Sequence, residues 1–228
     1  ATICAIFFLI VRYAISTFSG YDTAFNLVYQ LIQAPLTNMG TSLPGTLVAT
    51  FVNSALWLFG IHGTSVVEAV MQPVWYAARA ENLAIYNASV TALRPYIVTQ
   101  DFSNMVIFLS GTGITLPLTL QMMFMCKSER IKAIGKISVI PGIFNVNEPV
   151  IFGLPLVMNP VMIVPFFLAP IVAVVLAYGS MTLGIVPYPT GITIPWTMPA
   201  PFGGWLMTGS WTGGLLQIVI FVVSGIIY

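Results

Sequence analysis

The sequence is 228 residues long, and 58% of its residues are hydrophobic while only 6% are charged. Ordinary soluble domains contain roughly 25% charged residues, so this composition, with a mean hydropathy of +0.96, indicates a membrane protein. The net charge of +1 comes without a basic stripe that carries interleaved aromatic residues, which excludes nucleic acid as a partner. Cys4 and Cys126 stand far apart and lack CxxC spacing, so we expect no metal site, disulfide framework or other cofactor.

Apolar stretches that could form membrane-spanning helices occur along the whole chain. They cover residues 1–16, 45–60, 103–126, 156–179 and 205–228, and each approaches or exceeds the roughly 20 residues that span a bilayer. Backbone polar groups in hydrocarbon must be paired within their own segment, and the alternating pattern of a barrel strand is absent. The sequence therefore predicts an all-α membrane protein, a polytopic helical bundle of about five or six spans, some of them interrupted. Because the chain starts and stops inside apolar runs, we expect a piece of a longer protein and no signal peptide.

Residues 21–43 differ from these stretches because their apolar side chains recur at helical spacing with polar side chains between them. Phe25, Val28 and Ile32 follow this spacing, and Gln30 lies on the opposite side. Such a pattern predicts an interfacial amphipathic helix that lies along the membrane surface.

The first interruption of the bundle follows the second apolar stretch. The single histidine of the sequence, His62, lies there between two glycines. Ser65 followed by Glu68 has the spacing of a capping box, which predicts that a new helix starts at this point. Pro73 is expected to end that helix early. The sequence thus predicts a re-entrant hairpin near residues 61–80.

Basic residues gather in one loop after the third apolar stretch. Four of the seven Lys and Arg residues fall within ten positions, at Lys127, Arg130, Lys132 and Lys136. The positive-inside rule places this loop on the cytoplasmic side. A plain solvated turn, with Glu129 and Lys132 forming an ion pair, is also compatible with the pattern.

The second interruption is the string GIFNVNEPVIFG at residues 142–153, which sets Glu148 between Asn147 and Pro149. A residue before proline is biased away from the helical conformation, so the backbone at Glu148 is predicted to be unwound, within a second re-entrant hairpin near residues 141–155. Two broken segments in separate halves of a chain, each with an ionisable residue, are typical of the central binding site of a transporter.

The polar groups at these breaks suit a neutral, polyhydroxylated ligand. The Glu148 carboxylate can accept hydrogen bonds from hydroxyl groups, while Asn147 and His62 can both donate and accept. Trp57 and Trp196 stand beside the breaks and could stack on a sugar ring. Other interpretations remain open: Glu148 as a cap for freed backbone amides, His62 as a core histidine, and the tryptophans as membrane-interface anchors.

Three strings carry a resemblance to a known family: FNVNEPVIFGLPLVMNP, LWLFGIHG and FLSGTGITL. They resemble the membrane component EIIC of the bacterial sugar phosphotransferase system, in its lactose, cellobiose and diacetylchitobiose family. EIIC proteins are longer, and this chain is similar to their C-terminal half. The resemblance implies that residues 1–44 hold the last span of the N-terminal part and the interfacial helix. Residues 45–228 would form the sugar transport domain with its two re-entrant hairpins.

The resemblance also implies a function and its site residues. In this family the glutamate of the NEP motif and the histidine of the FGIHG motif contact the sugar, which here are Glu148 and His62. Trp57 and Trp196 fall where sugar-contacting tryptophans are expected. The family mechanism is group translocation, in which a disaccharide is imported and a phosphocysteine of the partner EIIB phosphorylates its C6 hydroxyl. Glu148 would be the catalytic residue that orients this hydroxyl or takes up its proton.

The implied partners are the disaccharide, the phosphorylated EIIB subunit, membrane lipid and, in the full-length protein, a second copy in a homodimer. The implied location is the bacterial inner membrane, as a multi-pass protein. The sequence has no phosphorylatable cysteine motif of the EIIB type, so this chain would bind and move the sugar while the partner donates phosphate.

Two other functions compete with this one. An ion-coupled secondary transporter, with Glu148 as its proton carrier, suits broken helices equally well. A membrane-embedded hydrolase or glycosyl transferase is disfavoured, because most glycosidases need two carboxylates that flank the bond and the sequence offers one convincing candidate.

Overall fold

The computed structural model describes residues 13, 39–154, 156 and 159–228. The chain divides into two compact units, residues 1–39 and 40–228. Only Tyr13 and Met39 of the first unit are described, so the fold presented below is that of the second unit. The apolar stretch at 1–16 and most of the amphipathic segment at 21–43 lie outside the described residues, and both remain predictions.

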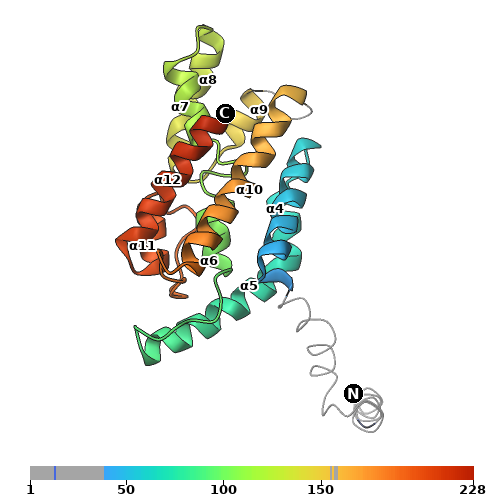
Figure 1. Cartoon of the computed structure of the whole chain (residues 1–228). Helices are drawn as coiled ribbons and strands as arrows, with labels where there is room; N and C mark the ends of the chain where they lie inside the picture. Colours follow the sequence, from blue (N-terminus) through green and yellow to red (C-terminus); the bar gives the residue numbers. More distant parts are fainter. Residues whose placement is uncertain (1–12, 14–38, 155, 157–158) are drawn as a thin grey trace, which may run out of the picture. The chain divides into compact units, whose positions relative to one another are not determined.

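The described residues of the second unit form helices and no strands, which confirms the all-α prediction for this part of the chain. Figure 1 shows α4, α10 and α12 along the body of the unit and α7 with α8 at one end. The elements are α4 (Leu43–Leu58), α5 (Gly63–Ala88), α6 (Gln100–Phe102), the π-helix η2 (Ser103–Ile107), α7 (Leu116–Phe124), α8 (Glu129–Ile143), α9 (Glu148–Gly153), α10 (Pro160–Thr182), α11 (Phe202–Thr208) and α12 (Trp211–Ile227).

The predicted spans correspond unequally to these helices. By length and composition, α10 is the one helix of the described part that could cross a membrane, while α4 and α12 are shorter apolar helices. The stretch at 205–228 is divided by Gly209, whose φ of 69° ends α11 in the left-handed conformation. The stretch at 103–126 is divided as well, because positive φ angles at Ser110, Gly111, Gly113 and Ile114 separate η2 from α7. Uninterrupted hydrophobicity therefore did not reveal these two breaks.

The expected end of the helix at Pro73 is wrong, because α5 continues through Pro73 to Ala88; the re-entrant hairpin near residues 61–80 stays a prediction. The chain turns at residues 59–62 instead, and the helix begins at Gly63 with His62 as its N-cap, so the predicted capping box is wrong too. Proline removes only one backbone donor from a helix. The residues just after it are held by packing: Trp75 is fully buried, and its Nε1 donates a hydrogen bond to the Gly40 carbonyl oxygen at 3.2 Å. Tertiary burial thus overrides the local cost of proline.

The second predicted interruption is present, but it is placed slightly differently. Helix α8 ends at Ile143 and α9 begins at Glu148, so the irregular backbone covers residues 144–147. Glu148 is therefore the first helical residue and not an unwound one. Pro149 lies in the first turn of α9, where its missing N–H removes no intrahelical hydrogen bond.

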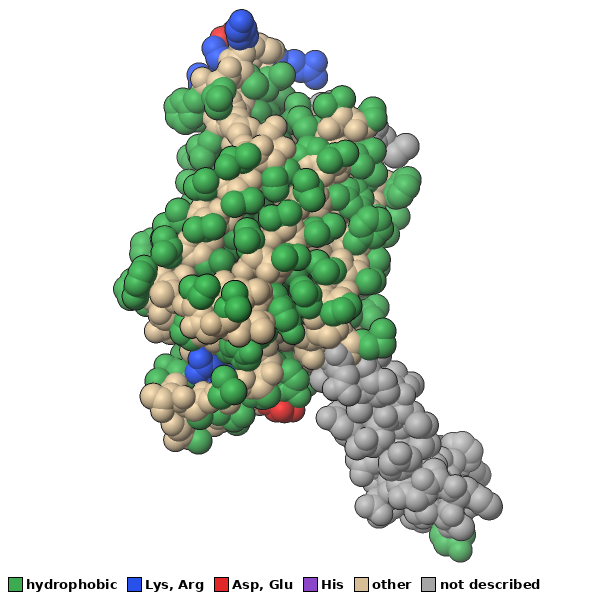
Figure 2. All heavy atoms as spheres, in the orientation of Figure 1, with side chains coloured by type: hydrophobic (Ala, Val, Ile, Leu, Met, Phe, Trp, Pro, Cys, Tyr) green, Lys and Arg blue, Asp and Glu red, His purple; other side chains and the backbone are tan. Residues whose placement is uncertain are grey.

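The molecular surface has two distinct regions in the view of Figure 2. Hydrophobic side chains cover much of the body, and Lys and Arg side chains gather at the tip formed by α7 and α8. The basic cluster of the sequence is at this tip, and the expected ion pair joins Lys132 Nζ to Glu129 Oε1 at 2.8 Å. The face of the body seen in this view has the apolar character expected of a helical bundle in contact with lipid.

Small residues allow α11 and α12 to pack with their backbones in contact. A Cβ atom added to Gly213 would meet the Gly204 carbonyl oxygen and the Thr208 hydroxyl, and the carbonyl cannot move aside as a flexible side chain could. By contrast, a Cβ atom added to Gly179 in α10 meets no atom within 4 Å.

We therefore expect opposite effects from the same substitution at these two glycines. Gly213→Ala should lower the free energy of unfolding by about 1–3 kcal/mol, because the added methyl group forces the helices apart. Gly179→Ala should raise it by about 0.5–1 kcal/mol through the lost flexibility of the unfolded chain. Thermal unfolding of both variants in one detergent measures the two shifts, and melting temperatures that move in the same direction would contradict this account.

Candidate functional site

A cavity of about 450 Å³ lies among five stretches of the second unit, around residues 57, 62–76, 100–112, 145–148 and 196. This size is usual for sites that bind small molecules. Its wall includes all five residues singled out in the sequence: Trp57, His62, Asn147, Glu148 and Trp196. The structure thus brings together side chains that are as much as 139 positions apart, from Trp57 to Trp196.

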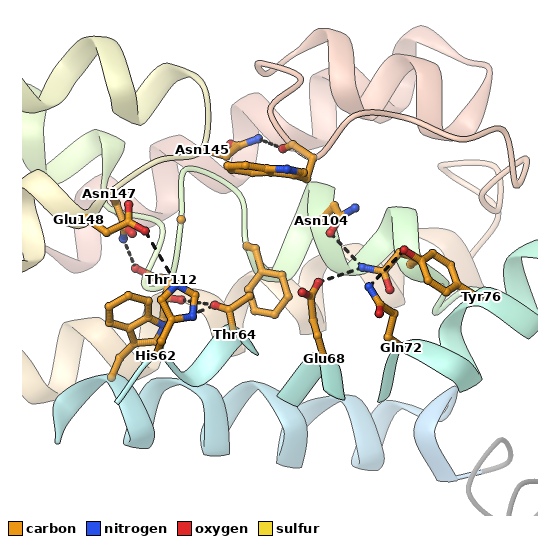
Figure 3. A pocket seen from close by; sticks show the side chains of 15 residues that line it. His62, Thr64, Glu68, Gln72, Tyr76, Asn104, Thr112, Asn145, Asn147 and Glu148 are labelled. Atoms are coloured by element: carbon orange, nitrogen blue, oxygen red, sulfur yellow. Dashed lines mark hydrogen bonds and ion pairs between the residues drawn. The ribbon is translucent and has the colours of Figure 1, made fainter. Parts of the chain in front are cut away.

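Glu148 and His62 face each other at one end of the cavity (Figure 3). His62 Nε2 lies 3.9 Å from Glu148 Oε1, and both side chains are about half exposed, at 51% and 44%. Glu148 Oε2 is buried and has no hydrogen-bond partner among the described residues. The half-exposed side chains leave Glu148 Oε1 and His62 Nε2 as the atoms that a ligand can reach at this end.

The indole ring of Trp57 packs against the imidazole ring of His62. Its ring centroid lies 4.5 Å from that of His62 at an interplanar angle of 53°. Its Nε1 donates to Thr64 Oγ1 at 3.4 Å, and the residue is only 4% exposed. Trp196 differs from it, because 55% of its surface is accessible. Of the two tryptophans, Trp196 offers the larger free surface for a ligand to stack on.

Asn147 fixes the backbone that leads into α9. Its Nδ2 donates both to the Thr112 carbonyl oxygen at 2.6 Å and to Thr115 Oγ1 at 3.2 Å, and the residue is 4% exposed. The carboxamide therefore ties the start of α9 to the turn between η2 and α7. Its contact with a ligand stays a prediction, whereas its bonds within the protein position Glu148.

Asn145 connects three irregular segments and was missed in the sequence analysis. Its Oδ1 accepts from the Ser110 backbone N–H at 2.6 Å. Its Nδ2 donates to the carbonyl oxygens of Trp196 at 2.6 Å and Met198 at 3.1 Å. The residue has a φ of 66°, which asparagine tolerates better than most residues. An asparagine in a Gly- and Pro-rich break was visible in the sequence, but its distant partners were not.

A second polar cluster occupies the other end of the cavity, on the right in Figure 3. Gln100 Nε2 donates to Glu68 Oε1 at 3.0 Å and to Asn104 Oδ1 at 3.1 Å. On α5, Gln72 Nε2 donates to the Tyr76 hydroxyl at 3.1 Å. The sequence favours a capping box for Glu68 over a role in ligand binding. The missed signal is the spacing of four residues that places Glu68, Gln72 and Tyr76 on one face of a helix.

The chemistry of this cavity favours a neutral polar ligand. Within the described part of the chain, no group of three or more His, Cys, Asp or Glu could hold a metal ion. Carboxylates at the two ends accept hydrogen bonds, carboxamides and the imidazole add donors, and Trp196 supplies an aromatic face. Such a set of groups fits a molecule with many hydroxyl groups along its length.

Comparison with known proteins gives consistent results. Residues 1–170 match the family described as Phosphotransferase system, EIIC. The chain is 41% identical over 204 residues to the PTS system oligo-beta-mannoside-specific EIIC component of Bacillus subtilis, covering 89% of this chain and 46% of that protein. It is 41% identical over 209 residues to the PTS system cellobiose-specific EIIC component of Geobacillus stearothermophilus, covering 91% and 46%. The chain thus spans about half the length of these relatives.

A solved structure is also similar to this fold. It is the crystal structure of the transporter ChbC, the IIC component from the N,N'-diacetylchitobiose-specific phosphotransferase system. The TM-score is 0.91 at 36% sequence identity, and the match covers 96% of this chain and 50% of that one.

Removal of the Asn145 carboxamide tests its role as the link between the three segments. Asn145→Gly keeps the positive φ accessible, so it removes the hydrogen bonds without adding backbone strain. The free energy of unfolding should fall by about 1–3 kcal/mol, because buried backbone groups lose their partners. Denaturant unfolding measures this, with Asn87→Gly at the exposed end of α5 as the matched control. An equal, small effect of both changes would rule out the linking role.

Proposed function

The chain belongs to the phosphotransferase system EIIC family, and from this premise we propose that it is the sugar-binding and translocating part of a membrane permease. Its substrate is a disaccharide, which is imported and phosphorylated at C6 by the partner subunit EIIB. The observation that carries the proposal is the pair of Glu148 and His62 at one end of a polar cavity of suitable size. The printed names of the relatives, which include cellobiose and oligo-beta-mannoside, support a substrate built from linked hexoses.

At the Glu148 end, the site would hold the hydroxyl group that receives phosphate. The sugar oxygen forms a bond to phosphorus while the sulfur–phosphorus bond of the EIIB phosphocysteine breaks. The electron pair of that bond stays on sulfur as a thiolate, and the hydroxyl proton passes to the Glu148 carboxylate. A base must lie within hydrogen-bond reach of the proton it removes, and the half-exposed Glu148 side chain supports this role because a ligand can approach it.

The length of the cavity supports a two-ring substrate. Residues 62 to 68 at the start of α5 correspond to a rise of roughly 9 Å, which separates the His62 end from the Glu68 end. A single pyranose ring held by Glu148 would leave Glu68, Gln100 and Asn104 without a ligand partner. A second ring would reach them and accept or donate hydrogen bonds there.

The basic tip formed by α7 and α8 gives the proposed orientation in the membrane. The positive-inside rule favours the cytoplasmic side for Lys127, Arg130, Lys132 and Lys136, and this is the side from which EIIB approaches. EIIC proteins are embedded in the membrane, and this proposal includes multi-pass insertion in the bacterial cell membrane. It also includes the two re-entrant hairpins near residues 61–80 and 141–155, and a homodimer of the full-length protein.

The two carboxylates of the cavity should respond differently when each is replaced by glutamine. Glu148→Gln should weaken disaccharide binding roughly 10- to 150-fold, the worth of one charge-assisted hydrogen bond, and should weaken binding of the corresponding monosaccharide by a similar factor. Glu68→Gln should weaken disaccharide binding alone, because the monosaccharide does not reach that end. Calorimetric titration with cellobiose and glucose measures both. If neither variant changes the affinity for any sugar tested, the proposed site is wrong.

The same Glu148→Gln variant separates orientation from proton transfer. If Glu148 only orients the hydroxyl, phosphorylation should fall in step with binding; if Glu148 is also the base, phosphorylation should fall further. Uptake in vesicles tests the competing function. Sugar accumulation without any phosphoryl donor, abolished by a protonophore, would favour an ion-coupled transporter instead.

Trp196 is expected to contribute an aromatic face to sugar binding. Trp196→Phe should weaken binding less than Trp196→Ala, because an aromatic ring retains part of the stacking area. Trp57→Phe serves as the comparison: its ring packs on His62 and its Nε1 bonds to Thr64, so it should act on the geometry of the imidazole. Titration with the same disaccharide gives the affinities. Equal and negligible effects of both Trp196 changes would make Trp196 a membrane-interface residue.

A further inference from the structure

The start of α5 determines which nitrogen of His62 carries a proton. His62 is the N-cap of this helix, and its Nδ1 accepts a hydrogen bond from the Ser65 backbone N–H at 3.2 Å. The Ser65 hydroxyl oxygen lies 2.8 Å from the same nitrogen. A protonated Nδ1 would point its hydrogen toward the backbone N–H, so this contact favours a lone pair on Nδ1, and the Ser65 hydroxyl then donates to the same lone pair. In a neutral imidazole the proton is then on Nε2.

The protonated side of the ring faces the cavity. His62 Nε2 lies 3.9 Å from Glu148 Oε1, too far for a good direct hydrogen bond. If an oxygen atom lay about 2.8 Å from both, the angle Nε2–O–Oε1 at that oxygen would be roughly 90°. A hydroxyl group can accept from one group and donate to the other at this angle. Trp57 packs against the ring and keeps it in this orientation.

We propose that the first turn of α5, through Ser65, locks His62 in the Nε2–H tautomer, so that His62 donates to the reacting sugar hydroxyl and Glu148 accepts its proton. This inference rests on the proposed function. The hydroxyl oxygen has two lone pairs: one accepts from His62 Nε2–H, and the other is left free to attack phosphorus. With no lone pair on Nε2, the imidazole cannot take the proton, which passes to the carboxylate. Ser65 is a positioning residue, since it does not line the cavity.

The tautomer can be observed directly because the sequence contains one histidine. In protein labelled with ¹⁵N-histidine and purified without a histidine tag, the His62 imidazole is the signal that the His62→Asn variant loses, and its couplings to the ring C–H protons distinguish the two nitrogens. At alkaline pH we expect Nδ1 to resonate as a nitrogen without a proton and Nε2 as a nitrogen with one. A dominant Nδ1–H form, or an even mixture of both forms, would overturn the inference.

Ser65→Ala provides the functional test, because it removes the hydroxyl but leaves the backbone N–H. Because one of the two donors to Nδ1 is lost, its spectrum should show a smaller fraction of the Nε2–H tautomer; an unchanged fraction would reject the role of the Ser65 side chain. If only this tautomer binds the sugar, the apparent dissociation constant equals the intrinsic one divided by that fraction. If half of the variant molecules carry the Nε2–H tautomer, the variant should therefore bind the disaccharide twofold more weakly. Ser89→Ala, at the other end of α5, is the matched control and should change neither quantity.

The outcomes separate this inference from the function on which it rests. A locked Nε2–H tautomer in a protein that binds no sugar would reject the proposed function and leave the lock in place. Sugar binding that stays at the wild-type value while Ser65→Ala shifts the tautomer would reject the donor role of His62. A merely structural role of Ser65 would lower the melting temperature without linking affinity to the tautomer fraction, and that result also rejects the proposal.

Discussion

A helix that breaks inside a hydrophobic environment frees backbone N–H and C=O groups, and each of them needs a partner because water is absent. In this protein two carboxamides meet much of that need. Asn145 joins the backbone of Ser110 to that of Trp196 and Met198, while Asn147 holds Thr112. The cavity exists because these side chains allow the chain to be irregular at several places at once. The positions of Glu148 and Trp196 both depend on these hydrogen bonds.

The same bonds divide the cavity residues into two kinds. Asn145, Asn147 and Trp57 are almost completely buried, and their side-chain N–H groups donate hydrogen bonds within the protein. Glu148, His62 and Trp196 retain accessible surface. In a preorganised binding site, buried residues hold the accessible residues in place. The protein then loses little conformational freedom when it binds a ligand.

Parts of this arrangement were accessible from the sequence. The helices α4 and α10 were predicted because their apolar runs are uninterrupted, and the break before Glu148 because glycine, proline and asparagine crowd it. Local rules failed at Pro73, where burial of the following turn keeps the helix intact. They also failed at His62, whose capping role depends on three-dimensional geometry. Asn145 could not be found, since its partners are 35 and 51 positions away. Contacts at such separations follow from the fold and not from local pattern.

The four-residue spacing along α5 has a geometric result for any molecule that lies against it. Four residues of an α-helix turn through about 400°, so each step along Thr64, Glu68, Gln72 and Tyr76 advances by about 40° around the axis. Over the three steps the stripe winds through roughly 120°. A straight molecule that lies along this stripe contacts Thr64 from one side and Tyr76 from another. The dihedral angle between two linked rings therefore governs the fit as much as their combined length does.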